Sequence, residues 1–173
     1  MTITPDTKDW TWVLRRPCPD CEFDATRQGL GELPGLIRST AATWTDVLTR
    51  SDAADRPRPD TWSPLEYACH VRDVHAVFGE RVRLMLAEDE PRFANWDQDA
   101  AAVEGDYVHQ DATAVSEQLV QAAGEVADVY AGVGEDALAR RGLRSNGDEF
   151  TVATIGAYHL HDVVHHLHDV GAR

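Results

Sequence analysis

Apolar residues recur at three- and four-residue spacing in four separate stretches of this chain, which predicts four amphipathic helices. The first stretch covers about residues 30–51, and Pro57 and Pro59 prevent its continuation. The positions that share one face of this predicted helix are Leu33, Leu36, Ile37, Thr40, Trp44, Val47 and Leu48.

The second predicted helix has the clearest start signal in the sequence. Ser63 can cap the helix, Pro64 suits the first helical position, and Glu66 can complete a capping box with the serine. An apolar stripe follows as far as about Ala87. We therefore expect a helix over residues 64–87 that ends before Pro91.

Two further helices are expected in the second half of the chain. Asp111 can cap a helix over about residues 112–132, and Thr151 can cap one that continues to about Val170. Residues 91–110 are expected to form a long connection that can include a helical turn, and a long connection inside a compact domain is more often functional than idle. The Phe-Thr-Val at 150–152 suits a short strand, but no partner for it is evident.

Four long helices with almost no strand signal predict an all-α fold, namely a four-helix bundle preceded by an irregular N-terminal arm. We expect the arm to cover residues 1–29 and the bundle to cover residues 30–173. The length of 173 residues and the 43% hydrophobic content suit one domain with one core.

The charge of the chain excludes several classes of partner. The formal net charge of −14 argues against binding to nucleic acid or to anionic membrane surfaces, which both require clustered cations. No apolar run approaches the roughly 20 residues that a membrane helix needs. The N-terminal sequence lacks the pattern of a signal peptide, so we expect a cytoplasmic protein.

Cys18-Pro19-Asp20-Cys21 is a CxxC motif without a second such motif in the chain. Three interpretations stay open: a plain turn, half of a metal site completed elsewhere, or redox chemistry. A structural zinc site normally needs four ligands, and a thioredoxin-type motif needs a strand before it and a helix after it. The sequence alone assigns no role to Cys18 and Cys21.

Five of the eight histidines fall within YHLHDVVHHLHDV, residues 158–170. At 100° per residue, with His161 at zero, the aliphatic side chains of this helix occupy an arc from about 180° to 320°. His161 and His165 lie on the border of that arc as an i, i+4 pair, which can chelate one ion. His168 lies one turn further on. The side predicted to be most distant from the core carries His159, Asp162, His166 and Asp169.

A third metal ligand is expected from another helix, and His70 on the second helix is the best candidate because it also flanks an apolar stripe. His75 lies on the other side of that stripe and is less suitable. Three neutral imidazoles with water suit zinc, nickel or iron. The segment from His161 to His165 also has the spacing of a zincin HExxH, but Asp162 replaces the glutamate, so a protease is disfavoured.

The segments WSPLEYACHVRDVHAVFGERV and YHLHDVVHHLHDV together resemble the DinB/YfiT-like superfamily of four-helix bundles, over about residues 30–170. The resemblance implies an up-down-down-up bundle in which one divalent metal is held by the second helix and by an i, i+4 pair on the last. Position by position, these ligands are His70, His161 and His165. A second register would select Asp162 and His166, and we rank it lower because the helical wheel turns both away from the core.

Members of the superfamily that this chain resembles include thiol transferases that use mycothiol, bacillithiol or glutathione, a maleylpyruvate isomerase, and many proteins of unknown activity. A metal lowers the pKa of a bound thiol or water, so the first hypothesis is an enzyme that activates one of these against a small electrophilic substrate. Asp73 or Asp162 is a candidate to orient a ligand imidazole. Trp96, Asp97 and Arg81 are candidates to line the mouth of the site.

Two rival hypotheses remain open. The protein can be a non-catalytic metal-binding or sensing module, which a closed shell with His168 as fourth donor would favour. It can also be a metal-free bundle that associates with other proteins and has a pH-responsive surface. Similar proteins are often homodimers, but no exposed apolar stripe in the sequence demonstrates one.

Overall fold

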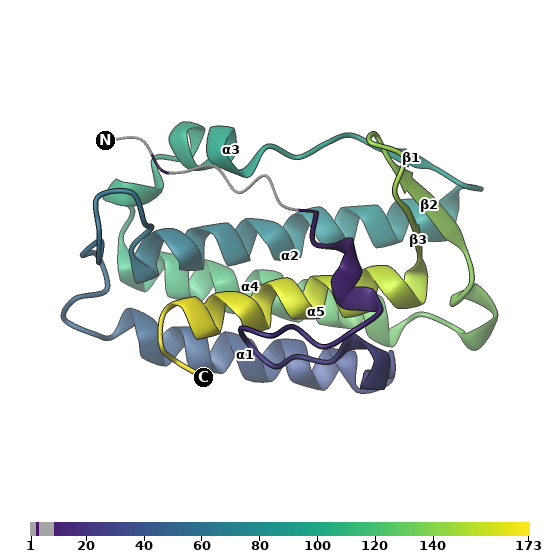
Figure 1. Ribbon diagram of the computed structural model, residues 1–173, viewed down its shortest axis with the longest axis horizontal. Coiled ribbons are helices and arrows are strands. Elements are labelled where there is room, and N and C mark those ends of the chain that lie inside the picture. Colours follow the sequence, from purple (N-terminus) through teal and green to yellow (C-terminus); the bar gives the residue numbers. More distant parts are fainter. Residues whose placement is uncertain (1–2, 4–8) are drawn as a thin grey trace.

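The computed structural model describes residue 3 and residues 9–173, so most of the first eight residues of the expected arm lie outside the described part. Four long helices form the body of the molecule, and a small sheet lies at one end (Figure 1). The helices are α1 (Leu33–Leu48), α2 (Pro64–Ala87), α3 (Gln98–Glu104), α4 (Ala112–Ala131) and α5 (Val152–Asp169). The strands are β1 (Arg92–Phe93), β2 (Arg141–Arg144) and β3 (Glu149–Thr151). The 3-10 helices are η1 (Thr11–Leu14), η2 (Ala25–Arg27), η3 (Tyr107–His109) and η4 (Glu135–Ala137).

The long helices have the predicted up-down-down-up topology. Helices α1 and α5 run in one direction, and α2 and α4 run in the other (Figure 1). Both α4 and α5 pack against α1 and α2, so the apolar stripes of all four meet in one core. The segment between α2 and α4 returns along the length of α2 and carries α3. No helix in the described part of the chain is long and apolar enough to cross a membrane.

The helix starts follow from their capping residues, as predicted. The Ser63 hydroxyl accepts a hydrogen bond from the Glu66 backbone N–H, and the Glu66 carboxylate accepts one from the Ser63 N–H. Asp111 caps α4, and Thr151 caps α5 together with Thr154. These local bonds satisfy backbone donors that a helix leaves unpaired at its first turn.

Glu66 is buried, with 2% of its surface exposed, and it also pairs with Arg56. Burial raises the pKa of this carboxyl, but the bonds from Arg56 and Ser63 outweigh burial and hold the pKa below its ordinary value. Because the pKa is lower in the folded state, this stabilisation is present above the unfolded pKa and is lost as the pH falls through the folded pKa. We expect Glu66→Gln to lower the free energy of unfolding by about 1–2 kcal/mol at pH 7.

Urea denaturation over a pH series measures this effect, and the difference between wild type and Glu66→Gln should shrink as the solution is acidified. Glu117→Gln is the control, because Glu117 is exposed on α4 and surface substitutions usually change stability by less than about 0.5 kcal/mol. A pH-independent difference would show that the charge of Glu66 contributes nothing.

The expected strand near residue 150 does have a partner, contrary to the sequence analysis. Strand β3 pairs antiparallel with β2, and β2 pairs parallel with β1, which follows α2. Arg140 fixes this sheet to the bundle by donating to the carbonyls of Met85 and Glu88 at 2.6 Å each. The partner strand was missed because its sequence, RGLR, lacks the apolar alternation that marks a strand.

The N-terminal arm packs along α5 (Figure 1). Val13 and Phe23 are buried, with exposed fractions of 0% and 5%. Both cysteines of the CxxC motif are buried as well, in contact with the bundle core. The arm therefore covers the side of α5 that carries His161 and His165, which the helical wheel placed on the border of the apolar arc.

Candidate functional site

The histidines of α5 contribute to two separate groups of potential metal ligands. In the first group, the ligand atoms of His70, Asp162 and His166 all lie within 4.8 Å of one another. In the second, the same limit holds for His161 and His165 together with Cys18 and Cys21. The structure thus does not bring the predicted trio of His70, His161 and His165 into one group.

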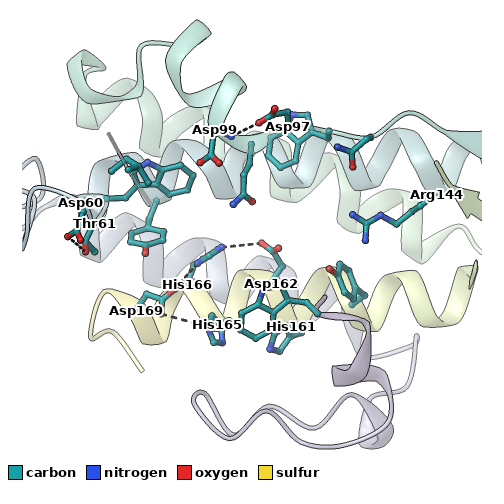
Figure 2. A pocket seen from close by; sticks show the side chains of 18 of the residues that line it. Asp60, Thr61, Asp97, Asp99, Arg144, His161, Asp162, His165, His166 and Asp169 are labelled. Carbon is teal, nitrogen blue, oxygen red and sulfur yellow. Dashed lines mark hydrogen bonds and ion pairs between the residues drawn. The ribbon is translucent and has the colours of Figure 1, made fainter. Parts of the chain in front are cut away.

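The first group spans two antiparallel helices. His70 lies in the second turn of α2, and its Nε2 is 3.6 Å from Asp162 Oδ1 on α5. His166 Nε2 lies 3.6 Å from the same oxygen (Figure 2). His70 is 1% exposed, and within the described part of the chain neither of its ring nitrogens has a hydrogen-bond partner. A metal ion would give such a buried imidazole a partner, and an unpaired buried polar atom costs about 1–3 kcal/mol.

The charges of the first group favour a cation. Burial raises the pKa of the Asp162 carboxyl, but the neighbouring imidazoles of His70 and His166 outweigh burial, so the net pKa lies below its ordinary value. Burial also lowers the pKa of His70, which keeps its imidazole neutral near pH 7. An ionised carboxylate on Asp162 and a neutral imidazole on His70 are the protonation states in which these two side chains bind metals.

Asp169 fixes the orientation of His166. The Nδ1 of His166 lies 2.8 Å from Asp169 Oδ2, and because a carboxylate only accepts, Nδ1 carries the proton. The lone pair of His166 is therefore on Nε2, the nitrogen nearest Asp162. This arrangement is the one in which a carboxylate orients a metal-binding histidine.

Asp162 and His166 of the first group line a cavity of about 660 Å³ (Figure 2). The rings of Trp62 and Trp96 lie 5.3 Å from that of His70, centroid to centroid, and both line the cavity. Asp97 lines it as well, as predicted. Arg81 does not, because its guanidinium lies over the rings of Phe78 and Phe93. Arg144, which sequence reasoning missed, lines the cavity from strand β2.

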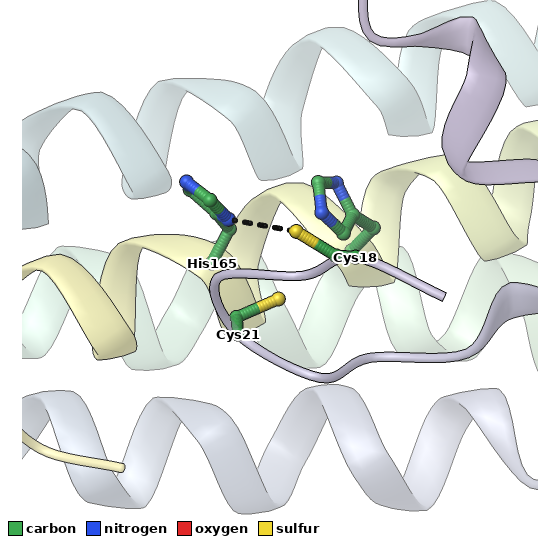
Figure 3. A group of neighbouring side chains, drawn as sticks. Cys18, Cys21 and His165 are labelled. Carbon is green, nitrogen blue, oxygen red and sulfur yellow. Dashed lines mark hydrogen bonds between the residues drawn. The ribbon is translucent and has the colours of Figure 1, made fainter. Parts of the chain in front are cut away.

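The second group joins the arm to α5. Cys18 Sγ lies 3.6 Å from His165 Nδ1, and both cysteines are free thiols with at most 4% of their surface exposed (Figure 3). Burial raises the pKa of the Cys21 thiol. The ring of Trp10 packs against those of His161 and His165, at centroid distances of 5.6 and 4.9 Å.

The predicted trio is divided because the core side of α5 is rotated from the position that its aliphatic residues indicated. His159, expected with Asp162, His166 and Asp169 on the side most distant from the core, is completely buried. Its Nε2 lies 3.0 Å from His75 Nδ1, and its Nδ1 lies 3.1 Å from the Tyr130 hydroxyl. The flanking Asp162 and His166 consequently face α2 and His70, whereas His161 and His165 face the arm.

Two other candidate residues have different surroundings from those expected. Asp73 accepts hydrogen bonds from Arg72 Nε at 2.8 Å and from the Tyr107 hydroxyl. His168 is exposed and belongs to neither group of ligands. The donors nearest His70 are therefore those of the second register, Asp162 and His166.

Comparisons with known proteins agree with the fold. A sequence model described as the DinB superfamily matches residues 36–170. A solved structure is described as "YfiT from Bacillus subtilis is a probable metal-dependent hydrolase with an unusual four-helix bundle topology". It superposes with a TM-score of 0.73 and 17% identity, over 84% of this chain and 86% of that chain. A search of curated proteins found no match.

Proposed function

Because the chain belongs to the DinB superfamily, we propose that it is a metal-dependent enzyme whose divalent ion is bound by His70, Asp162 and His166. The observation that carries this proposal is the convergence of these three side chains beside a cavity, with neither nitrogen of the buried His70 in a hydrogen bond to any described residue. These ligands differ from the first-ranked set of the sequence analysis, since His161 and His165 face the N-terminal arm.

The donor set narrows the choice of metal. Two imidazoles and one carboxylate suit zinc or iron, and nickel is also compatible with the imidazoles. Three protein ligands leave positions for water or substrate, which is typical of catalytic rather than structural sites. When bound, the ion supplies Lewis acidity that lowers the pKa of water or of a low-molecular-weight thiol such as mycothiol.

The residues that line the cavity indicate the chemical class of the substrate. Trp62, Tyr67 and Trp96 line the cavity and offer flat apolar surfaces. Arg144 lines the cavity and donates from Nη1 to Asp148 Oδ2 at 3.4 Å, while its buried Nε has no hydrogen-bond partner among the described residues (Figure 2). We infer a small electrophilic substrate, and Arg144 is a group on the cavity wall that can bind an anionic part of it.

The metal content of tag-free protein tests the ligand assignment. His70→Ala and His166→Ala should each abolish metal binding at this site and reduce turnover by at least about 100-fold, because loss of a direct ligand exceeds the 10–100-fold effect of an outer-shell partner. His168→Ala is the matched control, since this histidine lies exposed on the same helix. Equal metal content in wild type and His70→Ala would contradict the proposed ligand assignment.

The activity assay uses small anionic esters, amides and epoxides as substrates, with water or each common thiol as the second reactant. We expect hydrolysis or thiol transfer that requires metal and weakens when Arg144 is replaced by glutamine, through a higher KM. Metal-loaded protein that turns over none of these compounds would favour the alternative of a non-catalytic metal-binding or sensing module.

A further inference from the structure

The CxxC motif lies far from the first group of ligands in sequence but against the same helix in space. Figure 3 shows Cys18 and Cys21 on a loop of the arm, with both sulfurs on the side that faces α5 and His165. The loop is closed by the Cys18 N–H, which donates to the Phe23 carbonyl at 2.8 Å, and by the Glu22 N–H, which donates to the Cys18 carbonyl at 2.9 Å. This turn places both thiols on one side.

One pair among the four side chains already has the separation that a tetrahedral zinc ion requires. Zn–S bonds of about 2.3 Å and Zn–N bonds of about 2.0–2.1 Å at tetrahedral angles put sulfur and nitrogen about 3.6 Å apart. The observed distance from Cys18 Sγ to His165 Nδ1 is 3.6 Å. The ligand atoms of all four residues lie within 4.8 Å of one another, so only small rotations are needed to complete the shell.

The imidazoles of this group also have ring nitrogens in positions suited to metal binding. His161 is 3% exposed, and within the described part of the chain its Nε2 is buried without a hydrogen-bond partner. His165 Nε2 lies 3.8 Å from Asp169 Oδ1, which leaves Nδ1 directed at Cys18. The rings are held in place by Trp10 on one side and, for His161, by Phe23 at a centroid distance of 5.8 Å.

We propose that Cys18, Cys21, His161 and His165 form a second, structural zinc site that fastens the N-terminal arm to α5. Four protein donors close the coordination shell, in contrast to the open three-donor group at His70. The site holds Trp10 against the histidines, where all three line the cavity of the proposed active site. The arm thereby becomes a fixed wall of that cavity.

Two other roles for the motif fit the structure less well. Redox chemistry of the thioredoxin type places the CxxC motif at the start of a helix, whereas this loop leads into η2, a 3-10 helix of three residues. A plain turn would not bury two thiols beside an unpaired imidazole nitrogen. The proposal therefore accounts for more of the observed burial than either role does.

The test measures zinc in tag-free protein purified under reducing conditions and records the absorption of the cobalt-substituted protein. Wild type is expected to show the thiolate-to-cobalt charge-transfer band and intense tetrahedral ligand-field bands. Cys18→Ser/Cys21→Ser should lose the charge-transfer band and one equivalent of zinc. Cys69→Ala is the matched control, because this buried cysteine of α2 belongs to neither group, and it should keep both.

Wild-type protein itself provides a second measurement that does not depend on whether the serine variant folds. A mercurial reagent that blocks thiols should release one equivalent of zinc, and proteolysis of the arm should accelerate as the metal leaves. A cobalt spectrum of wild type without a thiolate band, or thiol blocking without zinc release, would overturn the proposal. The double variant His70→Ala/His166→Ala should retain the thiolate band, so failure of the proposed active site is distinguishable from failure of this second site.

Discussion

Acidification from pH 7 to pH 4.5 is expected to remove about 2–3 kcal/mol of the free energy of unfolding through one side chain, His75. This histidine is completely buried, and burial lowers its pKa from 6.5 to about 4. The unfolded chain therefore takes up a proton at this residue between pH 6.5 and 4, whereas the folded protein does not. Proton uptake by the unfolded state alone makes stability fall as the pH falls, and the full stability is present above pH 6.5.

Urea denaturation of wild type and His75→Leu at both pH values measures this effect together with the change that loss of His75 causes at its partner His159. Leucine fills much of the same space without a titrating group, so the loss of stability between pH 7 and 4.5 should be about 2–3 kcal/mol smaller in the variant. Phe78→Leu is the matched control, since Phe78 stacks on His159, the neighbour of His75, and does not titrate. An equal acid sensitivity in wild type and His75→Leu would contradict the prediction.

The helices were predictable from sequence because their signals are local. The capping boxes at Ser63 and Thr151 place the starts of α2 and α5, and the apolar stripes identify the faces that pack. The resemblance to the DinB superfamily, carried by a few residues of these two helices, is confirmed by the match over residues 36–170. The topology follows from the same resemblance, and the structure shows it directly.

The ligands of the metal site were less predictable than the helices, because a hydrophobic pattern counts histidine as polar and therefore assigns it to the exposed face of a helix. His75 and His159 pair with each other inside the core, so they behave as apolar residues although the wheel placed His159 outside. Including His159 in the buried face would have rotated the predicted core toward Asp162 and His166. The docking of Cys18 against His165 joins residues 147 positions apart, and no local signal in the sequence indicates it.

Asp169→Asn is expected to weaken metal binding at His70, Asp162 and His166 by about 10–100-fold, with little loss of stability. The carboxylate, 27% exposed, accepts from His166 Nδ1 at 2.8 Å and lies 3.8 Å from His165 Nε2. An asparagine can instead present its NH₂ group to Nδ1, which favours the tautomer with the proton on Nε2 and removes the lone pair from the metal side. The affinity is measured by competition with a chromogenic chelator.

The matched variant is Asp169→Glu, which keeps the carboxylate and should recover most of the affinity of wild type. A purely structural role for Asp169 would lower the thermal stability of both variants and leave their metal affinities alike. Because the same carboxylate lies beside His165, the asparagine variant should also shift the cobalt spectrum of the thiolate site, although less than loss of a direct ligand does. The two oxygens of Asp169 face His165 and His166, which are adjacent in sequence. This one side chain near the end of α5 would then affect metal binding by both groups of ligands.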